Sequence, residues 1–144
     1  MRIVIATKAH AEFIANNMRV QDIEELSKVG QSPLDALISG LESDQKYAVI
    51  HNNKPVMMFG LVADGFSTAI VWALGTEEIL DMRKEFISES LRWRDIFLQR
   101  YSILHNYIDV DNTIAIRWLQ YLGAKFSNPE PRGNGTFMRF ELHV

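Results

Sequence analysis

Residues 111–126 read DNTIAIRWLQYLGAKF. The apolar residues in this stretch recur at the spacing of one helical face, at Ala115, Trp118, Leu119 and Leu122. We expect Asp111 or Asn112 to cap the helix and Gly123 to end it, because glycine readily adopts the left-handed conformation found after helix ends. The stretch therefore predicts a short amphipathic helix that packs on a core.

On both sides of this helix, the hydrophobic periodicity predicts further strands and helices. Strands are expected at residues 2–6, 47–51, 56–63, 67–74, 103–110, 124–127 and 136–144, and helices at 9–18, 20–29, from 33 onward, and 82–101. The three successive strands are expected to be antiparallel. They are apolar on both faces in their middles, so helices should cover the sheet on each side.

Composition fits a single globular domain over residues 1–144, with a net charge of −3 and a pI of about 5.8. The net negative charge gives the protein no overall electrostatic attraction to nucleic acid. The arginines of the long helix alternate with acids, which is typical of a solvated face. The chain has no cysteine, which excludes thiolate catalysis, disulfides and cysteine-based zinc sites. The four histidines show no metal-ligand spacing, so no metal is expected.

No apolar run is long enough to span a bilayer, and none resembles a signal segment. We therefore expect a cytoplasmic location, which includes the cytoplasm of an infected cell.

The order of elements resembles the GCN5-related N-acetyltransferase (GNAT) fold over essentially the whole chain. Asn112, Ala115, Trp118 and Gly123, with Phe126 beyond, are similar to the penultimate helix of that family and its closing Gly-Phe. The resemblance implies a mixed α/β (α+β) fold with a central, mostly antiparallel sheet of about seven strands. The run from Trp72 to Phe126 also resembles the C-terminal half of GNAT-like internal virion proteins of short-tailed phages, which implies a possible place in the virion.

The resemblance implies acetyl-CoA as the cofactor of active members, which hold its pyrophosphate in a loop of the form (Gln/Arg)-x-x-Gly-x-(Gly/Ala). The corresponding residues 74–84 contain one glycine and three acids, Glu77, Glu78 and Asp81. Acids repel a diphosphate, and missing glycines remove backbone donors. We therefore expect a degenerate acetyl-CoA site and no bound cofactor.

The catalytic groups of the family are also incomplete. The tyrosine that protonates the leaving thiolate would correspond to Leu119, and Tyr121 lies on another face of the helix. Tyr107 and Glu77 are the remaining candidates for catalytic roles. Glu78, Asp109 and Asp111 are further possible bases, although Asp111 is expected to cap the helix.

Two functions remain open at this point. The first is a binding or structural protein on a GNAT scaffold, with a protein partner or self-association. The second is an N-acyltransferase with an unusual acetyl-CoA loop and an unknown acceptor. In either case the strands 67–74 and 103–110 should open a groove lined by Trp72, Leu74, Asn106 and Tyr107. In the second case this groove would take the pantetheine of the cofactor. The cofactor contacts would be Trp72, Ala73, Leu74, Arg83, Lys84 and Asn112.

Three large side chains of the predicted three-stranded region also have two possible roles. Met57, Met58 and Trp72 are expected in the core, with an exposed partner surface as the alternative.

Overall fold

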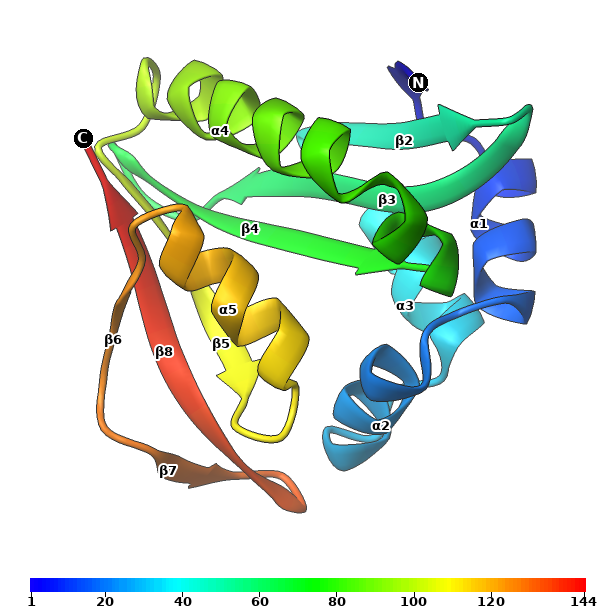
Figure 1. Ribbon diagram of the computed structural model, residues 1–144. Helices are drawn as coiled ribbons and strands as arrows, with labels where there is room; N and C mark the ends of the chain where they lie inside the picture. The colour runs from blue at the N-terminus through cyan, green and yellow to red at the C-terminus, as the bar shows by residue number, and fades with distance from the viewer.

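An eight-stranded sheet forms the centre of the computed structural model, which describes all 144 residues (Figure 1). The elements in chain order are β1 Arg2–Ile5, α1 Lys8–Asn16, α2 Val20–Lys28, α3 Pro33–Gly40, β2 Gln45–His51, β3 Lys54–Ala63, β4 Thr68–Gly75, the 3₁₀ helix η1 Glu77–Met82, α4 Arg83–Leu98, β5 Ile103–Asp109, α5 Thr113–Tyr121, β6 Lys125–Phe126, β7 Glu130–Arg132 and β8 Gly135–His143. The mixed α/β fold expected from the sequence is confirmed.

The strand order is β1-β2-β3-β4-β5-β8-β6, with β7 also paired to β8. Every pair is antiparallel except β4 and β5, which run parallel. The eighth strand is β7, which lies between the expected strands 124–127 and 136–144 and was not predicted as a strand. Gly133 takes a positive φ of 58°, which allows a tight turn that folds this segment back onto β8.

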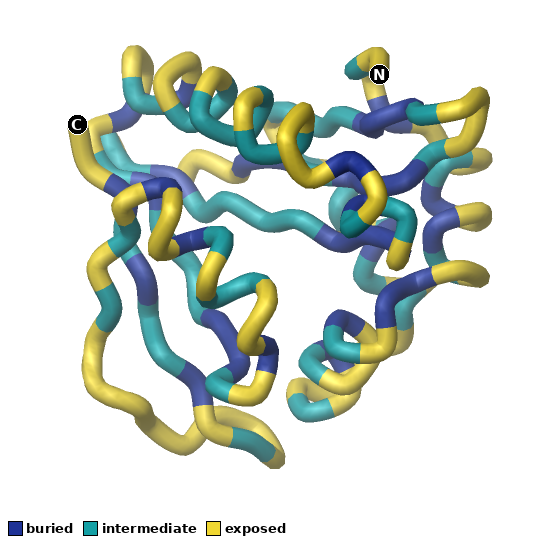
Figure 2. The backbone as a smooth tube through the Cα atoms, viewed as in Figure 1, coloured by how far each residue is buried: buried dark blue, intermediate teal, exposed yellow.

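Helices cover both faces of the sheet, as the apolar strands predict (Figures 1 and 2). Helices α1 and α3 pack Ile14 and Leu37 against Met58, and all three side chains are fully buried. On the other face, Phe97 of α4 packs with Leu61 and Leu104. Met57 is also buried, so the alternative of an exposed partner surface is wrong for both methionines.

The parallel pair of β4 and β5 is short. Its register runs only from Thr68 opposite Ile103 to Ile70 opposite His105, and beyond this point the strands diverge (Figure 1). We call the diverging segments, residues 71–75 of β4 and 106–109 of β5, the fork. Residues of both diverging segments line a cavity, so the groove expected between these two strands is present. Helix α2 lies beside the open end of the fork (Figure 1).

None of the helices combines enough length with enough apolar character to cross a membrane.

Candidate functional site

The closed end of the fork is held by one side chain, Asn106 of β5. Its amide nitrogen donates to the carbonyl oxygen of Val71 over 2.8 Å. Its amide oxygen accepts from the backbone N–H of Tyr107 over 2.7 Å. In a continued parallel ladder these two backbone groups would face each other. The Asn106 amide therefore stands where the next rung of the ladder would form, and the strands separate there.

The open end of the fork is held by helix α2. Asp22 accepts a hydrogen bond from the backbone N–H of Gly75, the last residue of β4, over 3.0 Å. Glu25 accepts one from the backbone N–H of Asp109, the last residue of β5, over 2.9 Å. The two acids are three residues apart and share one face of the helix. One helix thus places a carboxylate on the end of each diverging strand.

Backbone direction explains why these amides face the fork. Successive residues of a strand point their N–H and C=O groups to opposite edges. Val71 and Gly75 direct theirs toward β5, so the intervening Ala73 does the same. The carbonyl of Gly75 accepts from the backbone N–H of Arg19 over 2.9 Å. The backbone of Ala73 therefore faces the fork between two occupied positions.

Asn112 completes the polar contacts at the open end and is only 2% exposed. Its amide nitrogen lies 3.3 Å from Asp22 and 3.5 Å from Glu25, and its oxygen lies 3.5 Å from Arg19. It occupies the N-cap position of α5 without a side-chain cap bond, because its amide is turned into this group. The predicted cap position is therefore confirmed at Asn112, but the side-chain hydrogen bond expected of a cap is absent.

The ion pairs at the open end leave one acid without a cation. Arg19 pairs with Asp22 over 2.9 Å. Lys28 pairs with Asp109 over 2.7 Å and with the exposed Asp111 over 2.9 Å. Glu25 has no ion-pair partner. We call these six charged residues, together with Asn112, the open-end cluster.

Burial sets the protonation behaviour of this cluster. It raises the pKa of Glu25 from 4.5 to about 7, and the neighbouring Asp22 and Asp109 carboxylates act in the same direction. Burial also raises the pKa of Asp22, although Arg19 and the Gly75 amide oppose this. The hydrogen bonds from Lys28 to Asp109 and Asp111 raise the pKa of the lysine. Glu25 is therefore the group that titrates near neutrality.

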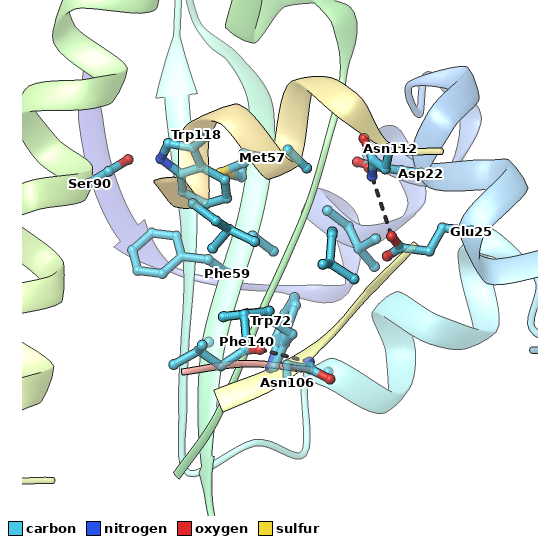
Figure 3. A pocket seen from close by; sticks show the side chains of 18 of the residues that line it. Asp22, Glu25, Met57, Phe59, Trp72, Ser90, Asn106, Asn112, Trp118 and Phe140 are labelled. Carbon is cyan, nitrogen blue, oxygen red and sulfur yellow. Dashed lines mark hydrogen bonds between the residues drawn. The ribbon is translucent and has the colours of Figure 1, made fainter. Parts of the chain in front are cut away.

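A cavity of about 660 Å³ passes through the fork, with 29 hydrophobic residues among its 43 lining residues. On one face of the sheet it is lined by Trp72 and Gly40, and on the other by Phe86 and Trp118. Figure 3 shows Asp22, Glu25 and Asn112 gathered at one end and Trp118, Met57 and Phe59 at the other. The site thus joins an aromatic pocket to a charged one.

The cavity brings together six of the side chains named from the sequence: Trp72, Ala73, Leu74, Asn106, Tyr107 and Asn112. Trp72 donates from its indole nitrogen to Ser43 over 2.9 Å. Glu77, Arg83 and Lys84 are exposed and do not line the cavity. The structure therefore separates these three from the other candidates.

The bend between β4 and α4 is built differently from a glycine-rich loop. It forms the 3₁₀ helix Glu77–Met82, and the side chain of Ile79 lies over the open face of Gly75. Thr76 donates its backbone N–H to the carbonyl of Val56 over 2.9 Å. Two successive backbone donors of the bend, at Gly75 and Thr76, are therefore occupied within the chain.

Sequence reasoning missed the residues of α2. Its apolar residues Val20 and Ile23 are 57% and 38% exposed, whereas Asp22 is 5% exposed. A hydrophobic pattern predicts the reverse orientation. The only available signal was the pair of acids three residues apart, which occurs on many solvated helices.

Solved structures with the same architecture are GNAT enzymes. An aminoglycoside 6'-acetyltransferase type Ii is 14% identical with a TM-score of 0.73, covering 99% of this chain and 97% of that one. A GNAT-family acetyltransferase from Bacillus anthracis is 11% identical with a TM-score of 0.73, covering 98% and 93%. The ribosomal-protein-S18-alanine N-acetyltransferase of Escherichia coli is 12% identical with a TM-score of 0.72, covering 99% and 93%. These similarities establish the GNAT fold.

Sequence comparison gives a narrower relationship. The probable scaffold protein gp13 of Escherichia phage T7 is 26% identical over 125 residues, covering 84% of this chain and 90% of that protein. Residues 46–130 match the family model described as "Bacteriophage T7, probable scaffold protein Gp13". The matched segment includes β4, β5, α5 and the whole fork. The chain therefore belongs to the phage T7 Gp13 probable scaffold protein family, on a GNAT fold.

Proposed function

We propose that this chain is a non-enzymatic, protein-binding member of the GNAT fold that is virion-associated or binds a host protein. The observation that carries the proposal is the occupied end of the fork. The backbone N–H groups of Gly75 and Asp109 face the fork and are bound by Asp22 and Glu25. A linear cofactor lying along β4 would need to displace these carboxylates.

The residues of the bend fit a pyrophosphate poorly. Ile79 covers the single glycine, and Glu77 adds exposed negative charge to the first turn of η1. A diphosphate would be repelled by this negative charge, and no group of free backbone N–H donors would offset the repulsion. Two cations of this stretch, Arg83 and Lys84, are exposed in the first turn of α4 and lie outside the cavity. This supports a degenerate acetyl-CoA site.

Family membership supports the binding role. The related phage T7 protein is described as a probable scaffold protein, which is a role in protein association. We infer from it a protein partner for this chain, either a second copy or another component of a phage particle. A place in the virion, or in the cytoplasm of the infected cell before assembly, follows from the same inference.

A ligand titration tests the loss of cofactor binding. Acetyl-CoA at millimolar concentration should leave the unfolding temperature unchanged, whereas an active GNAT enzyme measured in parallel should be stabilised. A saturable rise in the unfolding temperature of this chain would contradict the proposal.

Particle analysis tests the location. Mass spectrometry of purified particles of the encoding phage should detect the chain at a fixed number of copies per particle. Its absence from particles, together with synthesis early in infection, would favour binding to a host protein.

The cavity through the sheet favours a second candidate, an acyl-CoA-dependent N-acyltransferase. The backbone of Ala73 faces the fork, and Tyr107 and Glu25 line the cavity. The pKa of Glu25 is raised to about 7 by burial. Trp72, Ala73, Leu74 and Asn112 would then contact the cofactor. Release of free thiol from acetyl-CoA in the presence of a broad panel of amines would support this candidate over the first.

A further inference from the structure

Helix α2 is attached to the rest of the molecule mainly by polar contacts. Its residues Val20 and Ile23 face solvent, and Leu26 is its one buried apolar side chain. Its C-terminal end is held by the β7–β8 turn, where the backbone N–H of Asn134 donates to the carbonyl of Lys28 over 2.8 Å. Helices of this size usually dock through an apolar face. The position of α2 therefore depends on the open-end cluster.

Within that cluster, Glu25 faces more negative charge than positive charge. From its own helix it faces Asp22, and from β5 it faces Asp109. Their cations, Arg19 and Lys28, are each bound to those partners. Asn112 at the start of α5 contributes only a neutral amide.

The two remaining charged residues at the open end, Asp111 of the cluster and Arg132 outside it, make no ion pair with Glu25. Asp111 is bound to Lys28. Arg132 of β7 lies over the Tyr107 ring, 3.8 Å from its centroid, and forms no ion pair. Ionised Glu25 is therefore an uncompensated, partly buried charge.

We propose that α2 is a latch across the open end of the fork, and that loss of the proton from Glu25 loosens it. The protonated carboxyl keeps an oxygen that can accept the Asp109 N–H, so the closed state is retained. The ionised carboxylate keeps the same bond but repels Asp22 and Asp109 and loses hydration. Opening places it in water and removes both penalties.

The direction of the effect follows from proton linkage. The pKa of Glu25 is about 7 when the latch is closed and should return to its ordinary value near 4.5 when the latch is open. The open state therefore binds the proton less tightly, and a rise in pH favours opening. With these two values, the equilibrium constant for opening increases about tenfold between pH 6 and pH 8.

Opening would expose groups that are covered in the closed state. The backbone N–H groups of Gly75 and Asp109 would lose their carboxylate acceptors, and the charged end of the cavity would become accessible. The inference goes beyond the proposed function, because it concerns access to the fork whichever molecule enters it.

Hydrogen exchange on the full chain tests the latch. After correction for the intrinsic pH dependence of exchange, the amides of α2, Gly75 and Asp109 should exchange about tenfold faster at pH 8 than at pH 6. Amides of α4 should show no such change. In Glu25→Gln, which is neutral at every pH, the protection of α2 should be independent of pH and higher than in the unmodified protein at pH 8.

Glu24→Gln is the matched control, because Glu24 is the adjacent acid of the same helix and is exposed. It should retain the pH dependence of the unmodified protein. Equal protection of α2 at pH 6 and pH 8, or an unchanged pH dependence in Glu25→Gln, would overturn the latch. A carboxyl ¹³C titration gives a second readout, and a Glu25 midpoint near 4.5 would also overturn it. These results do not depend on acetyl-CoA or partner binding, so the proposed function is judged separately.

Discussion

The two ends of the fork between β4 and β5 are held by opposite kinds of chemistry. At the closed end a single neutral amide, Asn106, satisfies one backbone group on each strand. At the open end the carboxylates of Asp22 and Glu25, which belong to a cluster of six charged residues and one amide, accept the backbone N–H groups of Gly75 and Asp109. A neutral amide requires little desolvation, whereas buried charges require partners. The closed end should therefore be insensitive to pH, and the open end should respond to it.

The largest effect is expected from Asp22→Ala. The substitution leaves Arg19 buried without its partner and removes the acceptor of the Gly75 N–H. Loss of one partner of a buried ion pair costs about 3–5 kcal/mol. Urea denaturation should show this loss. Glu24→Ala on the same helix should change stability by about 0.5 kcal/mol or less, and an equal effect of both variants would contradict the assigned role.

A smaller loss is expected from Asn106→Ala at the closed end. The carbonyl of Val71 and the N–H of Tyr107 lose their partners, which costs about 2–3 kcal/mol in total. If the strands instead close by one rung, the loss will be smaller and a direct bond between these groups will appear by NMR. Either result shows that the Asn106 side chain keeps β4 and β5 apart. Unchanged stability without a new hydrogen bond between the strands would contradict this role.

The pH dependence of global stability separates the two ends further. Because the pKa of Glu25 is about 7 in the folded protein and 4.5 otherwise, the folded state holds this proton more tightly. The free energy of unfolding should therefore fall by about 2.5 kcal/mol as pH rises from about 4.5 to about 7. Denaturant unfolding at several pH values measures this fall. Glu25→Gln should remove it, and Asn106→Ala should not alter it.

The smallest effect is expected from Asp111→Ala. Asp111 is exposed, and in the variant its partner Lys28 still forms the ion pair with the buried Asp109. Exposed ion pairs contribute about 0.5 kcal/mol or less. Thermal unfolding should show a change of this size that disappears at high salt. A loss comparable to that of Asp22→Ala would mean that the outer part of the cluster supports α2 as strongly as the buried part.

The same contrast shows how far the sequence predicts the site. The fork itself was expected, because two apolar strands joined through the long helix resemble the GNAT order. Trp72, Leu74, Asn106 and Tyr107 were correctly expected at its walls. Asn112 was also named and lies at the N-cap position as expected, but its side chain does not cap the helix, because its amide bonds to the open-end cluster instead. Asp22 and Glu25 were not named.

By itself, the sequence determined the mixed fold, the order of its elements apart from β7, the buried methionines and the end of α5 at Gly123, where φ is +89°. Each of these follows from local periodicity or from one residue's backbone preference, which act over a few positions along the chain. Only the tertiary structure decided that α2 turns its acids inward and its valine and isoleucine outward. This orientation is stabilised by hydrogen bonds from Gly75, Asp109 and Asn112 to the two acids. These partners lie more than fifty residues away in the chain, so no local sequence pattern could predict the orientation.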